Sequence, residues 1–119
     1  MVLIKDNHID AAGSVKEAVS RVRGKWHDRF QIEVECRTLA EVEEALAAGV
    51  DRIMLDNMDR ARLRESLERI GGKVQTEISG NVTLESLSHL VPLRATYISV
   101  GALTHSVAAV DFSMTITME

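Results

Sequence analysis

Three charged residues, Lys5, Glu35 and Asp56, each stand at the end of a short apolar segment of this chain. In parallel α/β folds ligands bind at the carboxyl ends of the strands, so charged groups that recur there indicate an active-site rim. Carboxylates at neighbouring strand ends, such as Glu35 and Asp56, can hold Mg²⁺ or accept hydroxyl protons, because Mg²⁺ often takes only one or two protein oxygens. The alternative is a pair of solvated carboxylates, and these residues alone do not decide between the two.

Small residues at the next two strand ends indicate a phosphate site. Ser79 and Gly80 precede a short predicted helix, where backbone N–H groups and a hydroxyl can converge on an anion. Gly101 follows the next predicted strand, and the two loops together resemble the phosphate grip that many barrels build from their last βα loops. A glycine after one strand is usually only a turn residue, but two in succession favour a phosphate site. We expect His8 and His105 to be loop residues near the same rim, although a lone loop histidine is more often plain surface.

The apolar segments predict a scaffold that brings these strand ends together. Segments typical of strands begin near residues 31, 52, 73 and 96, at nearly even intervals of about 21 residues, which matches successive βα units with short loops. Helical patterns follow most of them, with Ser14 as one N-cap and with Thr38 and Glu41 as a capping box. The expected strands are 2–4, 31–36, 52–55, 73–78 and 96–100, and the expected helices begin near residues 14, 38, 59 and 84.

Strands that alternate with helices require crossover connections, so the sheet should be parallel and the fold class α/β. One face of the strands is apolar, whereas the other carries Glu33, Glu35, Arg52, Asp56 and Glu77. In a closed barrel this second face points into the lumen and its mouth. The alternative is a one-sided sheet whose polar face meets solvent. Because a complete (β/α)₈ barrel takes about 250 residues, five strands predict only the C-terminal part of a (β/α) barrel, incomplete as given.

Composition limits the kind of protein further. The 119 residues include 14 basic and 18 acidic side chains, a formal net charge of −4, and 45% hydrophobic residues, which is ordinary for one globular domain. This balance offers no broad cationic field, so we expect no nucleic-acid partner. The single Cys36 lies in a strand pattern and is expected to be a buried structural thiol. No pattern indicates a membrane span or a signal peptide, and we therefore expect a cytoplasmic location.

Five motifs of the chain, in order, strongly resemble those of the quinolinate phosphoribosyltransferase family and cover nearly its whole length. Ordered matches are far more specific than any one motif, and Asp111-Phe112-Ser113 is similar to the close of the family's C-terminal part. The resemblance implies a type II phosphoribosyltransferase-like barrel. The matching motifs are Leu3-Ile4-Lys5-Asp6-Asn7-His8-Ile9, Ile32-Glu33-Val34-Glu35-Cys36, Met54-Leu55-Asp56-Asn57-Met58, Glu77-Ile78-Ser79-Gly80-Asn81 and Ile98-Ser99-Val100-Gly101-Ala102-Leu103-Thr104-His105-Ser106.

The resemblance implies an enzyme of NAD biosynthesis. The family joins quinolinate to phosphoribosyl pyrophosphate with Mg²⁺ and releases pyrophosphate and CO₂, giving nicotinate mononucleotide. By resemblance, Lys5 lies at the quinolinate and pyrophosphate end of the pocket, and Glu35 and Asp56 bind the ribose hydroxyls and the metal, directly or through water. These three are the expected catalytic residues. The residues that the resemblance places at or beside the 5′-phosphate are Ser79, Gly80, Gly101 and His105.

The family also has an N-terminal α/β sandwich domain and a first half of the barrel, whose basic residues grip both substrates. Neither is matched here, so we expect residues 1–110 to form the second half of the barrel and 111–119 to form a terminal strand that joins the sandwich domain. The rim of this half is acidic, since Lys5 faces several carboxylates. We expect the chain alone to be inactive and poorly stable, and the full-length enzyme to be a homo-oligomer, a dimer or a hexamer.

Three alternatives stay open from the sequence. The chain could belong to a related phosphoribosyltransferase with another acceptor, because acceptor choice depends on residues outside it. It could be a non-catalytic phosphate-binding fragment, or a generic (β/α) barrel segment that binds another sugar phosphate. Changing Glu35 and Asp56 to alanine should abolish Mg²⁺-dependent binding of phosphoribosyl pyrophosphate if the chain belongs to a quinolinate phosphoribosyltransferase. Retained binding favours the generic barrel segment.

Overall fold

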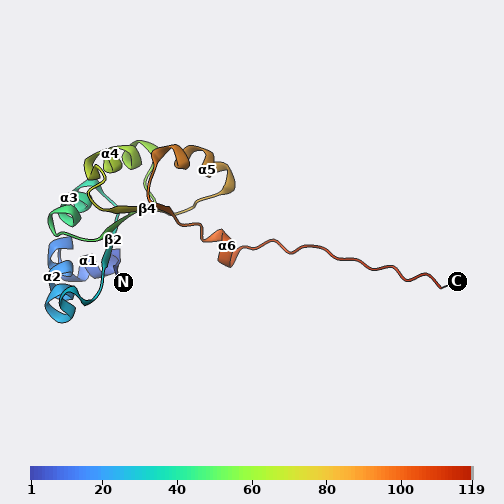
Figure 1. Ribbon diagram of the computed structural model, residues 1–119, viewed down its shortest axis with the longest axis horizontal. Helices are drawn as coiled ribbons and strands as arrows, with labels where there is room; N and C mark the ends of the chain where they lie inside the picture. Colours follow the sequence, from blue (N-terminus) through green and yellow to red (C-terminus); the bar gives the residue numbers. More distant parts are fainter. Residues whose placement is uncertain (119) are drawn as a thin grey trace.

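The computed structural model describes residues 1–118 and contains one parallel sheet of five strands in the order β1-β2-β3-β4-β5. Each strand pairs with the next one in the chain, as successive βα units require. Figure 1 shows the helices along one side of the curved sheet. The strands are β1 (Val2–Ile4), β2 (Ile32–Cys36), β3 (Arg52–Asp56), β4 (Gln75–Ser79) and β5 (Tyr97–Ile98). The predicted parallel α/β fold is therefore confirmed.

Side-chain caps set the starts of the main helices. The Ser14 side chain accepts a hydrogen bond from the Glu17 amide, and Thr38 and Glu41 form the predicted capping box. Asp59 caps the next helix by accepting from the Arg62 amide. The helices are α1 (Asp6–Ala12), α2 (Val15–Trp26), α3 (Leu39–Ala47), α4 (Arg60–Ile70), α5 (Leu84–Leu90) and α6 (Ala102–His105), with 3₁₀ turns η1 (His27–Arg29) and η2 (Val91–Leu93).

The core lies between the outer face of the sheet and the helices. Ile32, Val34, Ile53 and Leu55 of β2 and β3 are completely buried there, together with Val42 of α3. Full burial of such a side chain is worth about 1.5–3 kcal/mol, so this layer is the main source of stability. It fixes the rotation of the strands and thereby sends the alternate residues to the inner face.

Three carboxylates of the inner face are largely buried. Glu33, Glu35 and Glu77 are only 5%, 7% and 7% exposed, because neighbouring side chains crowd the concave side of the sheet. Leu3 and Tyr97 on the same face are 39% and 41% exposed, and the described helices lie on the other side of the sheet (Figure 1). The structure therefore leaves both the closed barrel and the one-sided sheet as alternatives.

Two segments differ from the sequence-based expectation. His8 and His105 were expected in loops, but His8 lies in α1 and His105 ends α6. The Lys5 amide donates to His8 Nδ1 at 2.9 Å, an unusual cap that starts α1 directly after β1. The strand β5 is also shorter than predicted, because β4 is its one neighbour among the described residues.

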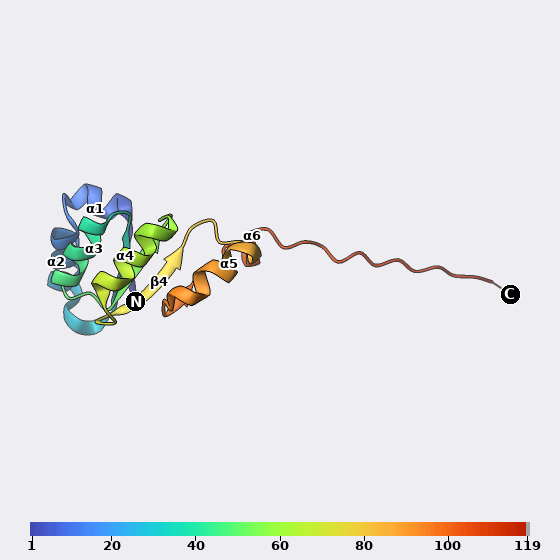
Figure 2. The same ribbon diagram turned by 90° about the horizontal axis from the view of Figure 1, so that it is seen from above.

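Residues 106–118 leave the body of the molecule as an extended segment (Figure 2). The predicted strand over 111–117 does not form within the described chain, because no other strand lies beside it to complete a hydrogen-bonded ladder. Its pairing with a further domain stays a prediction, and residue 119 lies outside the described residues. Among residues 1–118, no helix has the length and apolar character to cross a membrane.

Candidate active site at the carboxyl ends of the strands

Lys5 and Glu35 meet at the ends of β1 and β2. These strands are parallel neighbours with Ile4 opposite Val34, so the residues that follow lie at the same edge of the sheet. The Lys5 ammonium lies 3.6 Å from Glu35 Oε2. Burial raises the pKa of Glu35, and the nearby Lys5 charge acts in the opposite direction. The structure thus places the predicted cation and carboxylate in one charged pair.

Asp56 faces the same region from the end of β3. The β2–β3 register pairs Cys36 with Leu55, so Glu35 and Asp56 lie at the same edge of neighbouring strands, and the negative charge of Asp56 contributes to the raised pKa of Glu35. Asp56 Oδ2 accepts a hydrogen bond of 2.7 Å from the Asn57 side-chain amide. In the part of the chain that the structure describes, no three His, Cys, Asp or Glu side chains form a metal-binding group. Two carboxylates do fit Mg²⁺, which keeps water and substrate phosphates in its shell.

The four residues predicted to surround a phosphate line a single cavity of about 450 Å³. They come from the loop after β4 and from the segment between β5 and α6, two adjacent positions in the sheet order. The four are Ser79, Gly80, Gly101 and His105. Ser99 and Asn81 line the same cavity. Both stand in the matched motifs, but they were not among the predicted site residues.

Close contacts surround both glycines of this cavity, but only at Gly80 do a positive φ and a nearby backbone atom require glycine. A Cβ on Gly80, which has a φ of 96°, would lie 2.3 Å from Asn57 Oδ1, and a Cβ on Gly101 would lie 2.8 Å from His105 Nε2. Two helices begin at this cavity, because Thr83, the N-cap of α5, and Ala102, the first residue of α6, also line it. The Thr83 side chain accepts from the Ser86 amide. The expected role of a helix N-terminus in holding an anion stays a prediction.

A buried charge cluster lies deeper on the inner face. Arg52 Nη1 is 3.3 Å from Glu77 Oε2 and 3.7 Å from Glu33 Oε2, and its guanidinium stacks 4.0 Å from the centre of the Tyr97 ring. Ser99 donates a short hydrogen bond of 2.5 Å to Glu77 Oε1, which links the cluster to the cavity. The alternating pattern of β2, β3 and β4 predicted that these charged residues share the inner face. It did not predict that Arg52 would pair with both Glu33 and Glu77.

Glu33 is the member of this cluster whose charge is least compensated. Its Oε1 atom is buried and has no hydrogen-bond partner among the described residues. Burial and the neighbouring Glu77 charge raise the pKa of Glu33 to about 7. This carboxyl therefore exchanges its proton near neutral pH.

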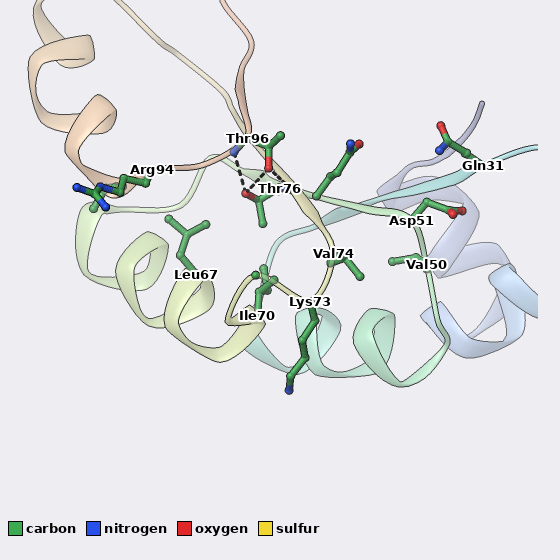
Figure 3. Close-up of a pocket in the computed structure, with 13 residues that line it drawn as sticks. Gln31, Val50, Asp51, Leu67, Ile70, Lys73, Val74, Thr76, Arg94 and Thr96 are labelled. Carbon is green, nitrogen blue, oxygen red and sulfur yellow. Dashed lines mark hydrogen bonds between the residues drawn. The ribbon is translucent and has the colours of Figure 1, made fainter.

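A larger hollow of about 630 Å³ lies at the opposite, amino ends of the strands (Figure 3). Thr76 and Thr96 face each other there, and each backbone amide donates to the other residue's hydroxyl at 3.1 Å. None of the predicted site residues line it. The larger volume is therefore not the candidate site, which is defined by the chemistry at the carboxyl ends.

An α/β sheet of sequential parallel strands, with charged groups and a small-residue cavity at the carboxyl ends, places the chain in the class of (β/α)-barrel proteins. Residues 1–115 match the family described as quinolinate phosphoribosyl transferase, C-terminal domain. The chain belongs to this family, as its motifs predicted.

Named relatives agree with this assignment. The chain is 47% identical to the tobacco protein "Quinolinate phosphoribosyltransferase [decarboxylating] 2a, mitochondrial", with all of the chain and 39% of that protein covered. It is 43% identical to the "Probable nicotinate-nucleotide pyrophosphorylase [carboxylating]" of Bacillus subtilis, where 98% of the chain and 40% of the relative are covered. The chain thus spans about 39–40% of the length of these curated relatives.

Solved structures show the same fold. The structure of NadC from Streptococcus pyogenes superposes with a TM-score of 0.87 at 43% identity, covering 96% of this chain and 40% of that one. The nicotinate-nucleotide pyrophosphorylase from Francisella tularensis gives a TM-score of 0.85 at 36% identity, covering 92% and 39%. Coverage of this size agrees with the predicted partial barrel. The cytoplasmic location stays a prediction, since names of plant relatives read mitochondrial or chloroplastic.

Proposed function

We propose that this chain forms the carboxyl-terminal half of the barrel of a quinolinate phosphoribosyltransferase. The reaction transfers phosphoribosyl from phosphoribosyl pyrophosphate to quinolinate, with loss of CO₂ and pyrophosphate, and gives nicotinate mononucleotide. The observation that carries the proposal is that Lys5, Glu35 and Asp56 share one edge of the sheet with the cavity after β4 and β5. The printed names of relatives 43–47% identical to the chain supply the substrate class.

The proposed reaction centre is the anomeric carbon of the ribose. A bond from the quinolinate nitrogen to this carbon forms as its bond to pyrophosphate breaks, and positive charge develops on the sugar. Glu35 and Asp56 would bind the ribose hydroxyls and stabilise that charge, while Lys5 would face the anionic quinolinate and pyrophosphate groups. Electrostatic positioning of this kind is commonly the largest contribution to catalysis.

The cavity would hold the other end of the sugar. Its volume of about 450 Å³ is large enough for a phosphate group. Because Gly80 and Gly101 have no side chains, the backbone N–H groups of the two loops and the Ser79 hydroxyl would be accessible to the phosphate as donors. His105, whose Nδ1 is hydrogen-bonded to Ser106 at 2.7 Å, would lie beside the phosphate. The phosphate would anchor the ribose so that its reacting carbon lies towards Glu35 and Asp56.

Glu35 and Asp56 would hold Mg²⁺, directly or through water, as the oxygen chemistry of the pair allows. When bound, the ion supplies positive charge that offsets the pyrophosphate leaving group. The carboxylates themselves keep the ribose end of the site negative, and Lys5 balances part of that charge. Further basic groups for the two anionic substrates would come from outside this chain, so we propose that the chain alone does not turn over quinolinate and that the full-length protein acts as a homo-oligomer.

NMR titration of the ¹⁵N-labelled chain with phosphoribosyl pyrophosphate tests the proposal. In the presence of Mg²⁺, the ligand should shift the amides of Glu35, Asp56, Gly80 and Gly101, and it should shift them far less when Mg²⁺ is chelated. E35A and D56A should each weaken the Mg²⁺-dependent affinity about tenfold or more, as expected for the loss of a metal or hydroxyl ligand.

The control is E65A, which removes an exposed carboxylate on α4 and should bind like the wild type. Absence of any shift at these four amides contradicts the proposed function. Wild-type affinity in both alanine variants favours a barrel that binds a different sugar phosphate.

A further inference from the structure

We propose that Asn57 is a positioning residue that joins the two halves of the candidate site. It orients the Asp56 carboxylate on one side and holds the Ser79–Asn81 loop on the other. The inference rests on the proposed function for the meaning of those two halves, but the contacts that carry it lie within the described chain.

Asn57 uses three groups at once. Its side-chain Nδ2 donates to Asp56 Oδ2 at 2.7 Å, and its Oδ1 accepts from the Asn81 side-chain amide at 3.1 Å. Its backbone N–H donates to the Ser79 carbonyl at 3.1 Å. A flipped amide would set its oxygen against the Asp56 carboxylate, so the orientation is fixed by charge. Among the described residues, no other hydrogen bond is made to the Asp56 side chain.

The backbone is shaped for this arrangement. Asn57 and Asn81 both have left-handed conformations, with φ values of 51° and 50°, and Gly80, which precedes Asn81 in the same loop, has a φ of 96°. Asparagine tolerates this region better than most residues that have a side chain. A side chain on Gly80 would collide with Asn57, at 2.3 Å from Oδ1, so the loop approaches closely because residue 80 is glycine.

The position of Asn57 explains how the Asp56 carboxylate and the Ser79–Asn81 loop could act on the same ligand. Asp56 and Ser79 lie opposite each other in the β3–β4 register, and each of the two strands ends in a turn immediately afterwards. A movement of the Ser79–Asn81 loop therefore passes directly to Asn57 and to the carboxylate that it orients. Occupation of the phosphate cavity would select the Asp56 orientation needed at the ribose end.

The test compares glycine substitutions that preserve a left-handed backbone. N57G removes both side-chain hydrogen bonds of Asn57, whereas N81G removes only the link from the loop. R94G is the matched control, because Arg94 also has a positive φ, of 59°, but lies by the hollow at the opposite end of the strands. Backbone ¹⁵N relaxation of the free variants reports the order of Ser79–Asn81, and NMR titration reports Mg²⁺-dependent binding of phosphoribosyl pyrophosphate.

We expect N57G to lower the ¹⁵N order parameters of Gly80 and Asn81, because the loop loses its contact with the Asn57 side chain. We also expect it to weaken Mg²⁺-dependent binding about tenfold, as is typical when a residue that orients a metal ligand is removed. N81G should loosen the loop but retain more of the affinity, because the Asn57–Asp56 contact remains. R94G should match the wild type in both measurements.

Two results would overturn the inference: a loop in N57G as ordered as in the wild type, or an affinity in N57G within twofold of the wild-type value. Equal losses in R94G would also overturn it, since the effect would then belong to any glycine substitution. If the wild-type chain binds no phosphoribosyl pyrophosphate, the proposed function fails, and the ¹⁵N order parameters of the free variants still decide the role of Asn57.

Discussion

Arg52 Nη1 lies 3.3 Å from Glu77 Oε2, and the same guanidinium is the counter-ion of Glu33 at 3.7 Å. One cation thus serves two buried carboxylates, and β2, β3 and β4 each contribute one of the three groups. Because a buried charge without full compensation is costly, this layer of the inner face should respond to pH.

The first prediction concerns the stability of the chain as the pH rises. Burial and the Glu77 charge raise the pKa of Glu33 to about 7, above the ordinary glutamate value in the unfolded chain, so the folded state binds this proton more tightly. The free energy of unfolding should therefore fall as the pH rises from about 4.5 to about 7. E33Q should remove this slope and be more stable than the wild type at pH 8, by about 1–2 kcal/mol.

Urea unfolding at several pH values between 5 and 8 measures both effects. E65Q serves as the control, because it makes the same change on an exposed part of α4 and should keep the wild-type slope. An E33Q variant that is less stable than the wild type at pH 8 would show that the ionised carboxylate is compensated after all.

The second prediction compares two glycines. G80A should destabilise the chain by about 1–3 kcal/mol, because Gly80 has a φ of 96° and an added Cβ would collide with Asn57. Gly24 lies inside α2, has no positive φ and would meet nothing within 4 Å, so G24A should stabilise the chain by about 0.5–1 kcal/mol. Urea unfolding of both variants checks the opposite signs, and a neutral G80A would mean that the loop after β4 relaxes freely.

The third prediction concerns the single thiol. Cys36 is completely buried at the end of β2, and burial raises its pKa to about 12. Because the thiolate is the reactive form, Cys36 should not react with a disulfide reagent in the native chain at pH 8, although it should react fully in urea. Rapid native labelling would indicate that β2 opens readily, in agreement with the expected poor stability.

Local signals in the sequence were sufficient for much of the fold. The period of two in β2 predicted which residues face the core, and the caps at Ser14 and Thr38 marked the starts of α2 and α3. Such signals work because each depends on residues within one turn or one strand.

The features that the sequence could not predict depend on distant residues or on unusual local contacts. The helix α1 begins with a His8 side chain as its cap partner, which is not a common capping signal. The role of Asn57 depends on its left-handed φ and on the close approach of Gly80 from another loop. The segment 111–117 alternates like a strand, yet a strand also requires a neighbour to pair with.

The last prediction uses the 3.6 Å pair between Lys5 and Glu35 to separate the two proposed roles at the rim. Without Mg²⁺, the Glu35 carboxylate repels an anion that approaches Lys5, so E35Q should bind pyrophosphate more tightly than the wild type, by about threefold. With Mg²⁺, the same variant has lost a proposed metal-binding carboxylate and should bind pyrophosphate more weakly. K5M should weaken binding in both conditions, because the attracting cation is gone.

NMR titration with pyrophosphate, in Mg²⁺ and in EDTA, measures these affinities at constant ionic strength. The change of sign for E35Q between the two conditions is the decisive result, because a purely structural defect would lower the affinity in both. If E35Q binds more tightly in both conditions, Glu35 acts only as a repelling charge, and the proposed metal role falls to Asp56 alone.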